Sequence, residues 1–251
     1  MNSKVLEKSK SSSLVESIIT QEENILRELE VEHCLYKLII QKEGLKQFAE
    51  AFYFVRYNFC RLNFILGERC GVDDFLWRGL VRNLIEELGG QKGISHNQLY
   101  RDFLSCVGIN SEKFLQDSIF SYQFNASWEK FCRDAPLLEA IAAISVYEVL
   151  DKPDYALLLR VLEKAGVAKQ GLHFFQVHAN AEHFEMFEDV ISWISKQERG
   201  EEIINNGRNF VFRTQRMMWA GLLNTLEEIS EKQGFSYTGS NSDVIIVQTD
   251  K

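Results

Sequence analysis

Residues 173–187 (HFFQVHANAEHFEMF) gather the side-chain types that bind transition metals. On a helix, Glu182 lies about 40° from His178 and Glu185 lies about 20° away on its other side. One face would therefore present an imidazole and two carboxylates, a donor set that suits divalent iron, manganese or zinc. His183 lies about 140° away and points elsewhere if the helix is regular. The alternative is a solvated acidic stripe with one packed histidine.

Three more polar side chains, Glu87, His96 and Glu148, occupy positions that helical periodicity assigns to apolar faces. The apolar residues on these faces are Leu76, Leu80 and Leu84 before Glu87, Leu99, Tyr100 and Phe103 after His96, and Leu137, Ile141 and Ile144 before Glu148. A buried carboxylate costs several kcal/mol unless it is paired or binds a cation. A single case is usually a helix end that reaches solvent. Several on separate helices, together with His178, indicate carboxylate–histidine metal ligation inside a bundle.

The elements that position these side chains are predicted to be helices. Apolar residues recur with helical spacing along the chain, only two prolines occur in 251 residues, and no strand pattern stands out. We predict seven to eight helices, including single helices over 48–66 and 173–187, a turn over 151–154 and a long last helix over about 207–232. The expected organisation is a disordered segment 1–13, one helical bundle domain over 14–233 and a tail over 234–251.

Charge and composition exclude several classes of protein. The net charge is −8, from 28 basic and 36 acidic residues, which disfavours binding to nucleic acid or to anionic membranes. Five scattered cysteines without a Cys-x-x-Cys motif predict neither a disulfide framework nor a zinc ribbon. The first 13 residues are polar and do not read as a secretory signal, and no stretch of about 18 apolar residues predicts a membrane span. We expect a protein of the reducing cytoplasm.

The order of the polar residues resembles that of the haem-oxygenase-like diiron oxidase family, a branch of the TenA, PqqC and CADD-like superfamily of helical bundles. The resemblance covers roughly residues 30–230 and includes the aromatic-rich segment FYFVR at 52–56. The family pattern is a Glu near a helix end, a Gly-containing loop, a His about ten residues on, a Glu on a later helix, and His-x3-Asp/Glu-x2-His. This chain reads Glu87-Leu-Gly-Gly…His96, Glu148 and His178-x3-Glu182-x2-Glu185.

This resemblance implies a single-domain, all-α, TenA-like up-down bundle that holds two iron ions, Fe(II)/Fe(III), with manganese as the alternative metal. It implies an O2-activating oxidase or oxygenase that acts on a small amino-acid-like or fatty-acid-like metabolite. Relatives cleave or desaturate C–C and C–N bonds or N-oxygenate their substrates. The implied ligands are Glu87 and His96 for one ion, Glu148 as the bridge, and His178, Glu182 and Glu185 to complete the pair. A homodimer is compatible with this class of protein.

Two ligand positions have alternatives. Glu185 stands where the family usually has His, and a local bulge of the helix would bring His183 inward instead. Glu86 competes with Glu87, but it lies about 200° from Leu84 and is expected to face solvent. Two other functions also stay open. One is a metal-free TenA-like enzyme, which would need an activated cysteine in its pocket, and the other is a non-enzymatic helical binding protein.

Two further sets of side chains are candidates for substrate contacts. Several aromatic residues could line a pocket, although aromatic residues at helical spacing are more often plain core. They are Phe52, Tyr53, Tyr57, Phe103, Tyr147 and Phe175. Arg208, Arg213 and Arg216 could clamp a substrate carboxylate, although a solvated helix face is the simpler interpretation.

Overall fold

Helices form every regular element in the described part of the protein. The computed structural model describes residues 2–41, 43–57, 59–90, 93–110, 119–180 and 184–235. The helices are α1 (Asn2–Glu28), α2 (Val31–Ile39), α3 (Gly44–Tyr57), α4 (Phe59–Arg69), α5 (Asp74–Glu87), α6 (His96–Cys106), α7 (Ile119–Asp134), α8 (Leu137–Lys164), the 3-10 helix η1 (Lys169–Leu172), α9 (His173–Asn180), α10 (Phe184–Ile194) and α11 (Gly200–Phe235). Among these described helices, none has the length and hydropathy needed to cross a membrane.

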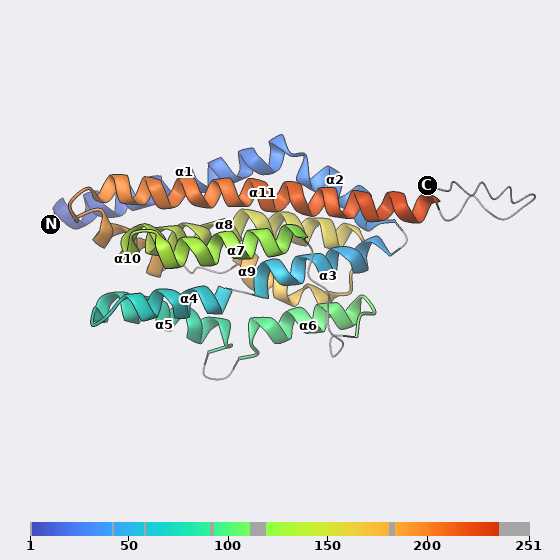
Figure 1. The fold of residues 1–251 in the computed structure, drawn as a ribbon, viewed down its shortest axis with the longest axis horizontal. Coiled ribbons are helices and arrows are strands. Elements are labelled where there is room, and N and C mark those ends of the chain that lie inside the picture. Colours follow the sequence, from blue (N-terminus) through green and yellow to red (C-terminus); the bar gives the residue numbers. More distant parts are fainter. Residues whose placement is uncertain are drawn as a thin grey trace, which may run out of the picture.

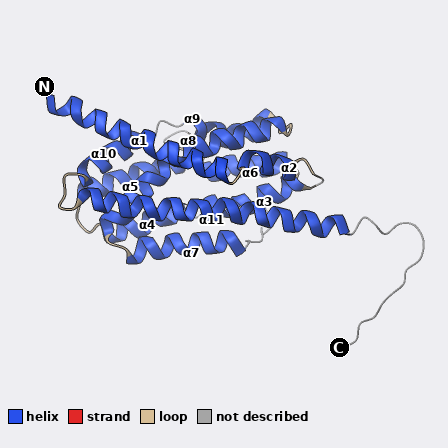
Figure 2. Ribbon diagram, turned by 90° about the horizontal axis from the view of Figure 1, so that it is seen from above, coloured by secondary structure: helices blue, strands red, loops and turns tan. Residues whose placement is uncertain are grey.

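Helix α8 lies at the centre of the bundle and packs against α1, α9, α10 and α11. In Figure 1, α11 and α1 run along one side, α7 and α8 form the middle, and α4, α5 and α6 lie on the opposite side. Figure 2 shows the same helices side by side along the long axis. At Gly207 of α11, a Cβ atom would lie 2.7 Å from the carbonyl oxygen of Glu139 and 2.8 Å from the nitrogen of Ala143. The absent side chain therefore lets the backbones of α8 and α11 approach each other.

Pro153 lies inside α8, which is one helix of 28 residues. The predicted turn over 151–154 is therefore wrong. Proline removes one helical hydrogen bond and costs about 3 kcal/mol in a helix interior, but tertiary packing of a helix can outweigh such a local preference. The residues on either side supply this packing, since several are at most 1% exposed. They are Val149, Leu150, Tyr155 and Leu158.

The bounds of the other helices agree with the predicted ones at some ends and differ at others. Ser95 caps α6 by accepting a hydrogen bond from the Gln98 N–H at 3.2 Å, as its position predicts. Helix α1 begins at Asn2, twelve residues before the predicted start at Leu14, and α11 is longer at both ends than the predicted helix. The segments predicted as single helices over 48–66 and 173–187 are each described as two helices, α3 with α4 and α9 with α10. The arrangement as a whole is the all-α bundle that the periodicity predicts.

A buried polar network joins α1, α8 and α11. Glu22 Oε1 accepts hydrogen bonds from Trp219 Nε1 at 3.3 Å and from Gln215 Nε2 at 3.4 Å, and the same Nε2 donates to Asp154 Oδ2 at 2.7 Å. Burial raises the pKa of both carboxyl groups, and the negative charge of Glu22 raises the pKa of Asp154 further. The pair therefore holds a proton to higher pH than a solvated carboxyl group does.

Candidate metal centre

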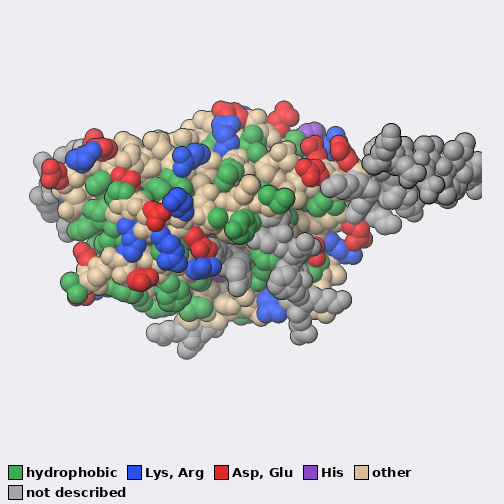
Figure 3. Space-filling model, in the orientation of Figure 1, with side chains coloured by type: hydrophobic (Ala, Val, Ile, Leu, Met, Phe, Trp, Pro, Cys, Tyr) green, Lys and Arg blue, Asp and Glu red, His purple; other side chains and the backbone are tan. Residues whose placement is uncertain are grey.

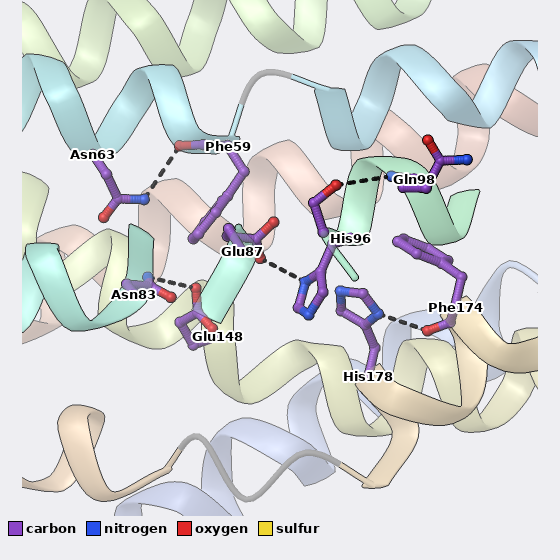
Figure 4. Close-up of polar contacts among 10 residues, drawn as sticks. Phe59, Asn63, Asn83, Glu87, His96, Gln98, Glu148, Phe174 and His178 are labelled. Atoms are coloured by element: carbon purple, nitrogen blue, oxygen red, sulfur yellow. Dashed lines mark hydrogen bonds and ion pairs between the residues drawn. The ribbon is translucent and has the colours of Figure 1, made fainter. Parts of the chain in front are cut away.

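Glu87, His96 and His178 converge at one point inside the bundle. Each of the three side chains offers one ligand atom, and these atoms all lie within 4.8 Å of one another. Glu87 ends α5, His96 begins α6, and His178 lies in the last turn of α9. Figure 4 shows the three side chains pointing toward one another from separate helices. The structure thus brings together three of the six side chains that the sequence analysis selects as ligands.

The loop between α5 and α6 places Glu87 beside His96. Gly89 and Gly90 have φ angles of 87° and 62°, a left-handed conformation that glycine adopts at little cost, and they end α5 directly after Glu87 and Leu88. Ser95 then caps α6, which fixes His96 as its first residue. As a result, His96 Nδ1 lies 3.1 Å from Glu87 Oε1. The two side chains are only 10% and 18% exposed, respectively.

His178 is held in a single orientation. It is 2% exposed, and its Nδ1 lies 2.7 Å from the carbonyl oxygen of Phe174 one turn earlier. Because a carbonyl oxygen only accepts, Nδ1 carries the proton, and in the neutral ring Nε2 then keeps its lone pair. The ring of Tyr155 stacks on this imidazole at 4.5 Å, and the His96 ring lies at the same centroid distance. A histidine with one nitrogen fixed by a backbone carbonyl is a common arrangement among metal ligands.

Glu148 lies on α8 and is 8% exposed. Its Oε1 accepts a hydrogen bond from Asn83 Nδ2 at 3.0 Å. Asn83 lies on α5 one turn before Glu87, so Glu148 lies alongside the three-residue cluster (Figure 4), although it is not part of the 4.8 Å group. Asn83 was not among the residues predicted from the sequence. The sequence does mark this residue, because Asn83 is a polar side chain on the same apolar helix face as Leu76, Leu80 and Glu87.

The remaining predicted ligands are not placed. Glu182 and His183 lie outside the described residues, and Glu185 lies in the first turn of α10, where only the backbone is described. The choice between Glu86 and Glu87 is clearer. Glu86 borders a shallow depression on the outer side of α5, whereas Glu87 contributes to the cluster. The geometry therefore favours Glu87.

A cavity of about 480 Å³ opens onto the cluster. Side chains in its lining beside the three polar residues include Tyr53, Phe59, Arg61, Phe64, Tyr100 and Phe174. Among the aromatic residues selected from the sequence, Tyr53 borders this cavity. Four others are at most 5% exposed and pack in the core, namely Phe52, Phe103, Tyr147 and Phe175. The side chain of Tyr57 lies outside the described part.

The three arginines of α11 do not border the cavity. Arg208 donates hydrogen bonds to Gln21 and Ser17, and Arg216 forms an ion pair with Glu28. Arg213 lies over the ring of Phe210, 5.7 Å from its centroid. These arginines are therefore not placed to bind the carboxylate of a substrate in this cavity.

Cys60 also borders the cavity, and its thiol is not activated. Burial, reinforced by the charge of Glu87, raises the pKa of Cys60 to about 11. A thiol with this pKa stays protonated at neutral pH, and the thiolate is the nucleophilic form.

The donor set fits a metal ion such as iron. Atoms bound to one ion at about 2.1 Å lie roughly 3–4 Å apart, so the three ligand atoms need only a small contraction to share an ion. Imidazole and carboxylate are suitable donors for Fe(II) and Mn(II). A cation would also compensate the charge of two shielded carboxylates, Glu87 and Glu148.

The fold is that of the haem-oxygenase-like helical bundles. The chain belongs to the family described as iron-containing redox enzymes, whose profile matches residues 46–211. A CADD-like protein of unknown function from Nostoc punctiforme has a similar structure, with a TM-score of 0.68 and 15% identity over 84% of this chain and 98% of that chain. A domain of unknown function with a haem-oxygenase-like fold from Shewanella denitrificans has a TM-score of 0.60 and 14% identity over 98% and 99%. These low identities show the shared fold. No curated protein matches the sequence.

Proposed function

We propose that the protein is a non-haem diiron oxidase or oxygenase that uses O2 to oxidise a small amino-acid-like or fatty-acid-like metabolite. The observation that supports this most strongly is the convergence of Glu87, His96 and His178 beside a cavity. It occurs in a member of a family described as iron-containing redox enzymes. Glu148 and, by the family order, Glu182 with Glu185 or His183 would complete the site for a second ion.

Bound iron would supply the electrons that reduce O2. The protein's own side chains prepare the site for this chemistry. The Phe174 carbonyl fixes the tautomer of His178, and Asn83 holds one oxygen of Glu148. Both contacts orient ligands before an ion arrives, which lowers the conformational entropy lost on binding.

The cavity lining supports the proposed class of substrate. Five of its thirteen lining residues are phenylalanine or tyrosine, namely Tyr53, Phe59, Phe64, Tyr100 and Phe174. Arg61 supplies a cationic group, and its side chain is 60% exposed while one of its nitrogens lies 3.1 Å from a Glu129 oxygen. A cavity that offers aromatic rings and one guanidinium group suits a molecule with an apolar body and a carboxylate.

The two alternative functions have weaker support. A TenA-like enzyme with a cysteine nucleophile would need an activated thiol, and burial holds the Cys60 thiol in its protonated form. A non-enzymatic helical binding protein does not account for two imidazoles and a carboxylate beside a cavity. Grouping these side chains costs desolvation energy that no ligand would compensate.

The proposal is tested by measuring metal in protein purified from cells supplied with iron, with manganese measured in the same samples. We expect one to two iron ions per chain and an O2-dependent change in the absorbance of the Fe(II) protein. Glu87→Ala should lose iron, whereas Glu86→Ala on the outer side of α5 should keep it. Wild-type protein that binds neither iron nor manganese would contradict the proposal.

A further inference from the structure

Four acidic side chains are buried among the residues whose side chains the structure describes, and they follow one another through the bundle. Glu148, Asp151 and Asp154 lie at three-residue intervals on α8, and they are 7% to 8% exposed. The fourth, Glu22 of α1, is fully buried, and its Oε1 shares the side-chain amide of Gln215 with Asp154. These four acidic residues are called the acidic row below.

The acidic row crosses α8 from the candidate metal centre to the opposite side of the bundle. Each step of three residues turns about 60° round the helix. As a result, Glu148 faces Asn83 of α5, whereas Asp154 faces Gln215 of α11 and Glu22 of α1. Figure 1 shows α5 and α1 on opposite sides of α8. Side chains three residues apart on a helix have Cβ atoms about 5–6 Å apart, a gap that one water molecule can bridge.

The surroundings of the acidic row differ from those of acidic residues elsewhere in the protein. On the face of the molecule in Figure 3, acidic side chains lie at the surface and close to basic ones. The side chains of the row are shielded from water, and no Lys or Arg is buried among the residues whose burial is described. An ionised carboxylate is strongly destabilised in such surroundings, and it usually takes up a proton instead. The row is therefore expected to hold protons.

The two acidic residues farthest from the metal centre are placed to share a proton. Glu22 Oε2 and Asp154 Oδ1 are buried, and neither accepts a hydrogen bond from any described residue. One proton held between the two carboxyl groups supplies the missing donor, and burial favours it because it raises the pKa of both groups. The charge of Asp151 raises the pKa of Asp154 further, whereas that of Arg216 lowers the pKa of Glu22. Arg216 is half exposed and forms an ion pair with Glu28, so it compensates the pair only in part.

Solvent comes close to this end of the acidic row at a depression between α1 and α8. The depression has a volume of about 530 Å³, and its lining includes Glu23 and Pro153, the sequence neighbours of Glu22 and Asp154. The cavity at the candidate metal centre is separate, since its described lining includes no residue of α1 or α8. A substrate that fills the cavity and excludes water would therefore leave the acidic row open to solvent at α1.

We propose that the acidic row carries protons from the solvent beside α1 to the candidate metal centre. The inference rests on the proposed function, because the reduction of O2 to water consumes one proton for each electron. Protons enter at Glu22 and Asp154, pass to Asp151 one turn from Glu148, and end on oxygen atoms derived from O2. Each carboxyl group takes up a proton from the group before it and gives one to the next, so its charge is restored after every transfer.

Infrared spectroscopy of the full, metal-free chain tests the end of the row at α1. At neutral pH, the wild type should show the C=O stretch of a protonated carboxyl group. Asp154→Asn should change the frequency of this band, and Glu22→Gln/Asp154→Asn should remove it. After transfer to D2O, the carboxyl proton should exchange at least about tenfold faster than the buried backbone amides, which exchange only when the structure opens. A missing band, or one that exchanges no faster than those amides, would overturn the proposal.

The reaction of the Fe(II) protein with O2 tests the end of the row at the metal centre. An amide does not relay protons as a carboxyl group does, so Asp151→Asn should slow the O2-dependent absorbance change at least about tenfold. Asp151→Glu should restore most of the rate. Ser145→Ala on α8 is the matched control, because Ser145 is also buried but donates its hydrogen bond to the Ile141 carbonyl of its own helix. This variant should react at the wild-type rate.

Iron content distinguishes a failure of this proposal from a failure of the proposed function. All three variants should keep their iron, because none of them removes a proposed ligand. A wild type without iron would contradict the proposed function, whereas the exchange of the carboxyl proton is measured without metal. The proton path would be ruled out by an iron-loaded Asp151→Asn variant that reacts at the wild-type rate. A rate that Asp151→Glu does not restore, or that Ser145→Ala lowers equally, would assign Asp151 a structural role instead.

Discussion

His178 donates a hydrogen bond from Nδ1 to the carbonyl oxygen of Phe174, 2.7 Å away and one turn earlier on α9. The bond leaves Nε2 as the nitrogen available to an ion, at the point where Glu87 and His96 also converge. This relationship makes His178 the most directly testable ligand of the candidate centre.

Replacement of His178 by Ala should abolish or strongly reduce iron binding. Removing a residue that only supports a ligand typically costs 10–100-fold in metal affinity, so loss of a ligand should cost at least about 100-fold. His173→Ala on the same helix is the matched control, because His173 is exposed and should be dispensable. Anaerobic titration with Fe(II), read by thermal shift, measures both. Equal Fe(II) affinity in the two variants would show that His178 is not a ligand.

Asn83→Ala should weaken iron binding about 10–100-fold without removing a ligand, because Glu148 would lose the donor that orients its carboxylate. Asn63→Ala is the control, since Asn63 is also a buried amide but donates to the Phe59 carbonyl of its own helix. Iron content after dialysis distinguishes them. If both variants retained iron to the same extent, the hydrogen bond between Asn83 and Glu148 would have no role in metal binding.

Cys60 should react slowly with iodoacetamide in the metal-free protein at neutral pH. Its pKa of about 11 leaves the thiol protonated, and the rate should rise as the pH approaches that value. Cys106 is exposed and serves as the internal comparison. Mass spectrometry of tryptic peptides gives both rates. Faster alkylation of Cys60 than of Cys106 at pH 7 would show an activated thiol and would favour the metal-free TenA-like enzyme.

Asp154→Asn should stabilise the protein at neutral and alkaline pH. The pKa of Asp154 is raised in the folded state, so its favourable contribution is complete below the unfolded pKa and is lost as pH rises through the folded value. An amide still accepts from Gln215 and donates to Glu22 without any charge to bury. Each kcal/mol gained should raise Tm by about 2–4 °C, with the difference from wild type vanishing near pH 4.

Asp154→Ala separates this charge effect from the hydrogen bonds. It leaves Gln215 and Glu22 with one partner fewer each, and it should be less stable than Asp154→Asn by about 1–3 kcal/mol at every pH. If Asp154→Asn were as unstable as Asp154→Ala at pH 8, the raised pKa would not be the relevant property.

Gly207→Ala should also destabilise the bundle. Alanine gains about 1 kcal/mol in helix propensity, but its Cβ would lie 2.7 Å from the Glu139 carbonyl oxygen and force α8 and α11 apart. Overpacking of this kind costs about 1–3 kcal/mol, so we expect a net loss. Asn205→Ala at an exposed position of α11 is the control and should change stability by less than about 0.5 kcal/mol. Urea unfolding compares the two.

Much of the fold and part of the site follow from the sequence. Helical periodicity and the scarcity of proline predict the all-α bundle, and polar residues on apolar stripes single out Glu87 and His96. Glycines after α5 and Ser95 before α6 signal the turn that joins them. These signals are local, so they can be read from neighbouring residues.

Contacts between distant residues could not be predicted in the same way. The continuation of α8 through Pro153 depends on tertiary packing, which outweighs the local preference for a turn. The pairing of Asn83 with Glu148 spans 65 residues, and that of Glu22 with Gln215 spans 193. Periodicity shows that such polar groups face inward, but it does not identify their partners. The ligand roles of Glu148, Glu182 and Glu185 stay predictions of the family order.

Pro153 has a mechanical consequence for the centre of the bundle. Its nitrogen carries no hydrogen, so the carbonyl of Val149 lacks the usual helical donor four residues later. Val149 immediately follows Glu148, and the turn that bears this carboxylate is therefore held by one backbone bond fewer than its neighbours. A displacement of that turn therefore breaks one backbone hydrogen bond fewer than a displacement of a regular turn of the same helix.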